Sequence, residues 1–201
     1  MAKKKGPPKE PSRRHGIHRF EEVLSAAEAL ITAGTSLDEL TLQGVAKKAG
    51  VPRVSLYYFF PSVDALIEAL YQRVLTRLMN ELATSEIKPT ADWRQVIKKV
   101  LDSVVKHYSR NHLTIVLALM PSSLTMVNQA HQVYGQSLAE LLVGLCGLKR
   151  SAKLNQGCEI AAELVTTIFR KSFIEKGSIT PAYQSEAQAA VIAYLTTVIE
   201  K

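Results

Sequence analysis

Residues 53–58 carry side chains that suit contacts to a nucleic acid. Arg53, Val54 and Ser55 come first. Their polar or short side chains can reach base edges, and the apolar side chain of Val54 suits the methyl group of thymine. Tyr57 and Tyr58 follow, and phenol hydroxyls at the end of rigid rings suit phosphate oxygens. The alternative interpretation is that both tyrosines belong to a hydrophobic core.

Other polar residues nearby are candidates for phosphate contacts. Thr41 precedes an apolar helical pattern, so its hydroxyl and the adjacent backbone N–H groups could bind a phosphate, or its hydroxyl could simply cap the helix. Lys48 is either a phosphate contact or part of a solvated helix face. Arg13 and Arg14 end a basic segment and complete the predicted set.

The first twenty residues hold most of the charge of the chain. They contain seven Lys or Arg residues and one Glu, so they account for six of the seven net positive charges. Their Gly, Pro and charge content leaves too few apolar side chains for independent folding. This basic arm suits a polyanion, and the alternative is a solubilising tail.

Two short helices must position residues 53–58. The pattern predicts one helix from Thr41 to about Lys48 and a second from Pro52 to about Phe59, joined by a tight turn at Gly50. Glycine adopts unusual turn conformations at little cost, and proline suits the first turn of a helix. Two short helices joined in this way have the dimensions of a helix-turn-helix.

Apolar residues at three- and four-residue steps predict an all-α fold along the rest of the chain. The predicted helices cover about 13–33, 62–85, 91–110, 112–120, 124–145, 151–176 and 181–199. We expect a flexible arm over 1–14, a three-helix DNA-binding domain over 15–62 and a helical bundle over 63–201.

The segment from Thr41 to Phe60 resembles the N-terminal signature of the tetracycline-repressor (TetR) family. The matching elements are Thr41, Val45-Ala46, Ala49-Gly50-Val51 and Leu56-Tyr57-Tyr58-Phe59-Phe60. The resemblance implies a transcriptional regulator, usually a repressor, that binds a palindromic DNA operator as a homodimer and is released by a small-molecule effector. The family commonly has a lysine where this chain has Val63, so the phosphate contact of that lysine is not expected, and the basic arm is available to compensate.

The resemblance also implies that the bundle over 63–201 is a ligand-binding and dimerisation domain, with an effector cavity and a helical dimer interface. Polar or aromatic residues in apolar helices are the candidates for an effector, which would then be hydrophobic or amphipathic: Trp93, Tyr108, His112, Met120, Met126, His131, Tyr134 and Phe173. Small or apolar residues of the last two helices are the candidates for dimerisation, unless they pack within one chain: Cys158, Ala161, Ala162, Val165, Phe169, Ala190, Ala193 and Tyr194.

Several other classes are not favoured by the sequence. It contains no recognisable catalytic or nucleotide-binding motif, so we expect neither an enzyme nor a cofactor. Cys146 and Cys158 lack zinc-ligand spacing, and we expect reduced core thiols and no metal. With no apolar run of roughly 20 residues and no signal peptide, we expect a cytoplasmic protein without a membrane partner. A dimeric ligand-binding or adaptor protein that does not bind DNA is the remaining alternative.

Overall fold

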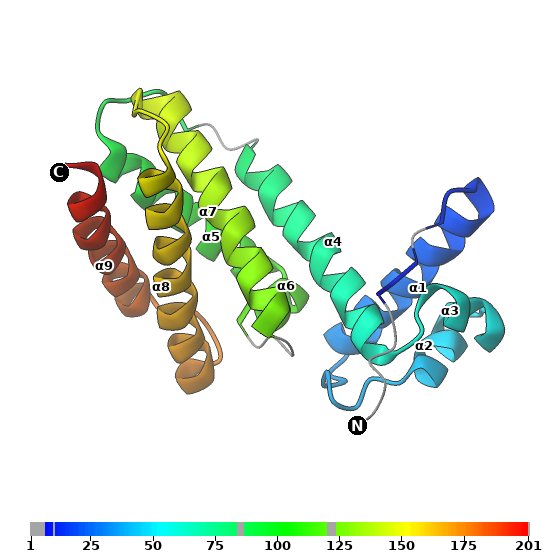
Figure 1. Ribbon diagram of the computed structural model, residues 1–201. Coiled ribbons are helices and arrows are strands. Elements are labelled where there is room, and N and C mark those ends of the chain that lie inside the picture. Colours follow the sequence, from blue (N-terminus) through cyan, green and yellow to red (C-terminus); the bar gives the residue numbers. More distant parts are fainter. Residues whose placement is uncertain (1–6, 10, 84–86, 120–123, 201) are drawn as a thin grey trace. The chain divides into compact units, whose positions relative to one another are not determined.

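The computed structural model describes residues 7–9, 11–83, 87–119 and 124–200, and these residues form helices and no strands (Figure 1). The helices are α1 (Arg14–Thr32), α2 (Leu42–Ala49), α3 (Arg53–Phe59), α4 (Val63–Ala83), α5 (Trp93–Arg110), α6 (His112–Leu119), α7 (Leu124–Cys146), α8 (Ala152–Lys176) and α9 (Pro181–Ile199). The predicted all-α fold is confirmed. No described helix has the length and apolar character needed to cross a membrane.

The chain divides into two compact units within α4. The N-terminal unit is Met1–Val74 and the C-terminal unit is Leu75–Lys201. Because α4 runs without a break from Val63 to Ala83, one helix contributes residues to both units. This division falls later in the chain than the boundary predicted at residue 62.

The N-terminal unit is built around a small apolar core. Leu24 of α1, Val45 of α2, Leu56 of α3 and Leu66 of α4 are all almost fully buried. Phe60, just after α3, is also buried and stacks on Phe20 of α1 with ring centroids 4.8 Å apart. Buried apolar side chains therefore hold the short helix α3 in the core of this unit, where it packs against α1 and α2.

A polar contact joins α4 to α1 inside the same unit. The guanidinium of Arg73 donates two hydrogen bonds of 3.2 Å to the Ser25 hydroxyl. It also lies 3.5 Å from the carboxylate of Glu21 and 3.9 Å from that of Glu28. The first half of α4 is thus held to the N-terminal unit by both apolar packing and a charged cluster.

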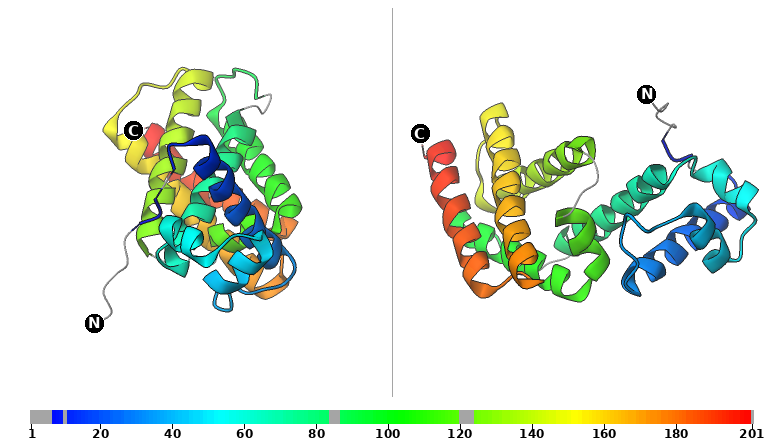
Figure 2. Two further views of the ribbon diagram at one scale, coloured as in Figure 1. Left: turned by 90° about the vertical axis from the view of Figure 1, so that its right-hand side faces the viewer. Right: turned by 90° about the horizontal axis from the view of Figure 1, so that it is seen from below.

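In the C-terminal unit, α8 packs between α7 and α9, as Figures 1 and 2 show. Two glycines permit very close approaches. A Cβ atom on Gly135 of α7 would lie 2.6 Å from the Cα of Glu159, and one on Gly157 of α8 would lie 2.8 Å from a methyl group of Val198. The α8 to α9 turn is fixed by Ser172, whose hydroxyl donates to the Ser178 carbonyl and accepts from the backbone N–H of Thr180.

Candidate functional site

The turn between α2 and α3 has the geometry of a helix-turn-helix. Thr41 caps α2, because its hydroxyl accepts a hydrogen bond from the Gly44 N–H at 3.1 Å. Gly50 ends α2 with a φ of 66°, a left-handed conformation that favours glycine. The N–H of Val51 donates to the carbonyl of Ala46 at 3.1 Å. These local interactions turn the chain sharply, so α3 begins soon after α2 ends.

Helix α3 has one buried and one exposed side. Leu56 and Phe59 are buried, and they hold the helix to the core. Val54 is 83% exposed, Tyr58 64% and Tyr57 50%. The tyrosines are therefore surface residues, and the alternative that both belong to the core does not hold. An apolar side chain as exposed as Val54 contributes little to folding and is free to contact a ligand.

The remaining predicted DNA-binding residues are also accessible: Thr41, Lys48, Arg53, Arg13 and Arg14 are exposed, and Ser55 is half-buried. The segment from Thr41 to Val63 contains three Lys or Arg residues and no acidic residue. An outward-facing surface of this charge would attract a polyanion and would not repel it locally.

The basic arm makes two contacts with the end of α3 that the sequence did not predict. The backbone N–H of Lys9 donates a 2.9 Å hydrogen bond to the carbonyl of Phe59. The Lys9 ammonium lies over the ring of Tyr58, 5.8 Å from its centroid. Pro11 also lies against Gly16, where a Cβ atom would be 2.8 Å from that of the proline. The arm is thus attached to the exposed surface of α3 at its C-terminal end.

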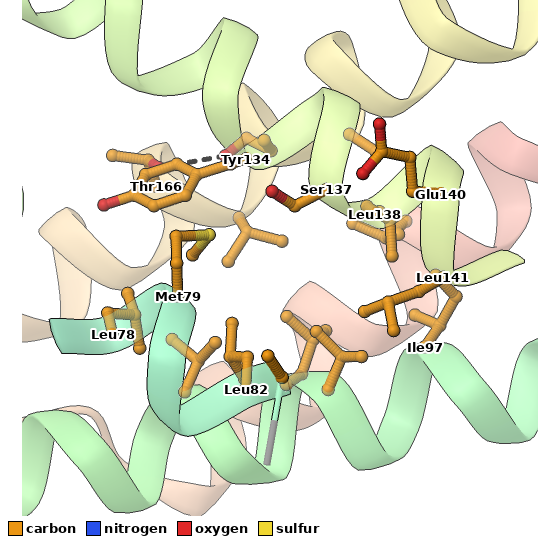
Figure 3. Close-up of a pocket in the computed structure, with 18 of the residues that line it drawn as sticks. Leu78, Met79, Leu82, Ile97, Tyr134, Ser137, Leu138, Glu140, Leu141 and Thr166 are labelled. Atoms are coloured by element: carbon orange, nitrogen blue, oxygen red, sulfur yellow. Dashed lines mark hydrogen bonds between the residues drawn. The ribbon is translucent and has the colours of Figure 1, made fainter. Parts of the chain in front are cut away.

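The C-terminal unit contains a pocket of about 610 Å³ (Figure 3). Small-molecule sites in proteins commonly have volumes of roughly 300–1,000 Å³ and mainly apolar walls. Most of the lining side chains here are aliphatic, and α4, α5, α7 and α8 supply almost all of them. The helices of this unit can therefore enclose a small apolar molecule.

Two of the eight predicted effector residues, Tyr108 and Tyr134, line this pocket. Trp93, Met126 and His131 are buried elsewhere, while His112 is exposed with its ring near that of Phe173. Met120 lies outside the described residues. The residues that the sequence prediction missed are mainly aliphatic, among them Leu78, Leu82, Val100, Leu138 and Leu141. Nothing in the sequence distinguishes such a leucine from a core leucine.

Three predicted dimer residues are completely enclosed in one chain, which corrects their assignment. Cys158, Ala161 and Phe169 are at most 1% exposed and belong to the core of the C-terminal unit. The reason is that α8 is covered within the same chain by α7 and α9. Ala161, Ala162 and Val165 also line the pocket. Ala190 and Tyr194 are half-buried and Ala193 is exposed, so these three have surface that a partner could cover. The accessible surface of the half-buried Ala162 and Val165 includes the pocket wall.

The buried side chains of His107 and Cys158 are held by contacts within the fold. His107 contacts the Glu81 carboxylate through Nδ1 and the Thr114 hydroxyl, 3.3 Å away, through Nε2. Burial raises the pKa of the Cys158 thiol to about 12, so this group remains a thiol at neutral pH. Among the described residues, no three His, Cys, Asp or Glu side chains are grouped so that they could hold a metal ion.

Comparisons with known proteins agree with this geometry. Residues 23–70 match the family model of bacterial regulatory proteins of the tetR family. A helix-turn-helix transcriptional repressor of Mycobacterium tuberculosis is 29% identical over 119 residues, which are 59% of this chain and 44% of the repressor. The nucleoid occlusion factor SlmA of Haemophilus ducreyi is 27% identical over 93 residues, which are 46% of each chain. This chain thus spans less than half the length of these two relatives.

The similarity to solved structures extends over most of the chain. A TetR-family transcriptional regulator from Streptomyces coelicolor is 26% identical with a TM-score of 0.64, and the alignment covers 90% of this chain and 99% of the regulator. A TetR transcriptional regulator from Rhodococcus has the same fold, with a TM-score of 0.66 at 18% identity over 92% of this chain and 97% of that one. On its helix-turn-helix, its family match over residues 23–70 and its fold, the chain is similar to the tetR family of bacterial regulatory proteins.

Proposed function

We propose that this protein is a sequence-specific DNA-binding transcriptional regulator that represses its target genes. The observation that carries the proposal is the exposed surface of α3, where Arg53, Val54, Tyr57 and Tyr58 face outward beside a segment without acidic residues. Arg53 and Val54, near the start of α3, would read base edges in the major groove. The tyrosines, Thr41 and Lys48 would bind phosphates and set the register.

The basic arm would add contacts that do not depend on sequence. Because Lys9 is bound to the C-terminal end of α3, the described part of the arm lies beside the proposed DNA surface. Lysines that neutralise phosphates release counterions, and this raises affinity for all DNA sequences. The arm would thereby replace the phosphate contact that Val63 cannot make.

The regulator would act as a homodimer through the outer faces of α8 and α9. Ile160 and Ile174 are exposed, 39% and 64% respectively, and lie on one side of α8 together with Thr167. The exposed side of α9 is formed mainly by small residues, including Ala189 and Ala193. Apolar and small exposed residues at helical spacing favour close helix pairing. A two-fold dimer would recognise a palindromic operator.

An effector bound in the pocket of the C-terminal unit would lower the affinity for DNA. Leu78, Met79 and Leu82 of α4 line the pocket, while the first half of the same helix belongs to the N-terminal unit. A displacement of this helix could therefore reach the DNA-binding unit. Ligand and DNA would then antagonise each other reciprocally, with a coupling of about 1–3 kcal/mol in typical systems.

Selection of duplex DNA from a random pool, followed by sequencing, tests the central proposal. We expect enrichment of a palindrome with half-sites about one helical turn or a multiple of it apart. Arg53→Ala should weaken binding to that palindrome by about 1–3 kcal/mol and relax the preference at one position of each half-site. Lys98→Ala is the matched control, because it removes one exposed positive charge from α5 in the other unit.

Three outcomes would contradict parts of the proposal. If no sequence were enriched while the protein was a dimer by analytical ultracentrifugation, the alternative of a dimeric adaptor that does not bind DNA would be favoured. If Arg53→Ala and Lys98→Ala had equal effects on affinity, α3 would not be the element that reads bases. A monomer at micromolar concentration, both free and with the selected DNA, would contradict the dimer.

A further inference from the structure

Three hydroxyl-bearing residues of the pocket of the C-terminal unit lie together on α7 and α8, and their chemistry indicates which class of molecule fits. Asn80 of α4 and Tyr108 of α5 are the other uncharged polar residues of a mainly apolar lining. We propose that the pocket binds an uncharged, mainly apolar molecule with an oxygen-bearing group at one end, of the class of medium-chain alcohols, ketones and esters, and that it rejects carboxylates. This inference rests on the proposed role of the pocket as the effector site.

The polar side is formed by hydroxyl groups from two helices. Tyr134 and Ser137, one turn apart on α7, and Thr166 of α8 lie together on one side of the pocket, while Leu82 lies on the other (Figure 3). The Thr166 hydroxyl donates to the carbonyl of Ala162 at 2.9 Å, so toward a ligand it can act only as an acceptor.

Ser137 is the residue best placed to bind a ligand oxygen. It is half-buried, lines the pocket and has no hydrogen bond to any protein group that the structure describes. A free hydroxyl can donate to a carbonyl or ether oxygen and can also accept from an alcohol. The polar end of a ligand would therefore lie against α7, with its apolar part toward α4 and α5.

The charges around the pocket exclude an anion. Glu140 is the one charged residue among the described lining residues. Its carboxylate lies at the edge of the pocket, accepts a 3.2 Å hydrogen bond from the Gln136 amide and is 4.0 Å from the Arg150 guanidinium. No described lining residue is Lys, Arg or His, and residues 84–86 and 120–123 contain none either. A carboxylate in this pocket would be desolvated without a cationic partner, which is strongly unfavourable.

Competition among ligands of equal chain length tests the proposal on the full-length protein at pH 7.5. The probe is N-phenyl-1-naphthylamine, a neutral dye that fluoresces in apolar surroundings. The competitors are decan-1-ol below its solubility limit, and decanoate and decylammonium below their critical micelle concentrations. We expect the dye to bind, and decan-1-ol to displace it at a concentration at least about tenfold lower than either ion, because each ion must be desolvated.

Variants of α7 localise the binding. Leu138→Trp would fill the pocket and abolish dye binding, whereas Val133→Trp, at an exposed position of the same helix outside the pocket lining, should leave it unchanged. Gly144→Leu is a second filling variant, because a Cβ atom there meets nothing within 4 Å. Ser137→Ala should lower the affinity for decan-1-ol by about three- to tenfold, the loss expected for one hydrogen bond, and leave the affinity for the dye unchanged.

Three results would overturn the proposal: competition by decanoate as strong as that by decan-1-ol, strongest competition by decylammonium, or no dye binding by a protein whose circular dichroism shows the helical fold. None of these results depends on DNA. If the proposed function itself failed, the protein would select no DNA sequence while its dye binding stayed as expected, so the two failures are distinguishable.

Discussion

The two units carry their candidate sites in opposite ways. In the N-terminal unit the site is an outer surface, and the residues that fix α3 (Leu56 and Phe59) are different from those offered for contact. In the C-terminal unit the site is an interior space, and residues such as Ile97 and Ala161 are both core and pocket wall. Contact residues of α3 can therefore change without loss of stability, whereas most changes in the pocket also affect the fold.

The largest expected effect comes from breaking the core of the N-terminal unit alone. Phe60→Ala removes a completely buried ring that stacks on Phe20, and we expect it to lower the free energy of unfolding by about 3–5 kcal/mol. DNA binding should be lost while the pocket still binds the neutral dye. Tyr57→Ala, at a half-exposed position, should change stability by no more than about 0.5 kcal/mol. Parallel loss of dye binding in Phe60→Ala would show that the units do not fold independently.

A smaller loss of stability is expected from a substitution where α7 and α8 are in contact. Gly135→Ala places a methyl group 2.6 Å from the Cα of Glu159, so the helices must separate, and overpacking of this kind costs about 1–3 kcal/mol. Thermal unfolding would measure this loss of stability. Gly144→Ala on the same helix is the control, because its methyl group would meet nothing within 4 Å. It should stabilise the helix by about 0.5–1 kcal/mol. A loss of the same size in both variants would contradict the close approach.

Deleting residues 1–8 sharpens the comparison further, because it removes Lys3, Lys4 and Lys5 and leaves the helices of both units intact. Affinity should fall for all DNA sequences, and the dependence of log affinity on log salt should become shallower by roughly 0.9 for each phosphate that the arm no longer neutralises. Titrations at several salt concentrations measure this. A double Lys98→Ala, Lys99→Ala variant removes exposed charge from α5 and should leave the slope unchanged. An unchanged slope in the deletion would identify the arm as a solubilising tail.

The smallest expected effect is a pH dependence confined to the C-terminal unit. The pKa of His131 is lowered mainly because burial disfavours its charged form. The unfolded chain therefore binds a proton more readily than the folded one, so stability is complete above the ordinary pKa of about 6.5 and falls as pH drops below it. Thermal unfolding between pH 7.5 and 5 should show this fall, and His131→Phe should reduce it. His18→Gln, which changes an exposed histidine, should not. Equal pH dependence in wild type and His131→Phe would contradict the prediction.

Helix positions were predictable because their end signals are local. Gly50 and Gly177 end α2 and α8 in left-handed conformations, and Thr41 and Ser151 cap the starts of those helices through their hydroxyls. The residues offered to DNA were predictable for a similar reason, since α3 contributes most of them from one run of six. Their role in binding DNA stays a prediction, although their exposure agrees with it.

The pocket could not be predicted because it depends on how distant helices meet. Leu82 and Leu138 are far apart in sequence and line the same space, while Leu142, one turn beyond Leu138, is completely buried in the core. The polarity of a residue also did not indicate whether it lines the pocket. Trp93 and His131 are covered by their own unit, and Ser137, the hydroxyl with the most capacity for a ligand, had no local feature that distinguished it.

The glycine contacts of α8 have a mechanical consequence. Side chains that separate two helices can change rotamer and let the helices slide, but a glycine in contact with a backbone leaves no such adjustable layer. Gly135 meets the backbone of Glu159 in this way, and Gly157 lies against the side chain of Val198. A β-branched side chain in a helix has little rotamer freedom, so we expect α7, α8 and α9 to move as one rigid body. The compliant walls of the pocket are then those of α4 and α5. A ligand that needs more room would displace these two helices, and α4 is the one that continues into the N-terminal unit.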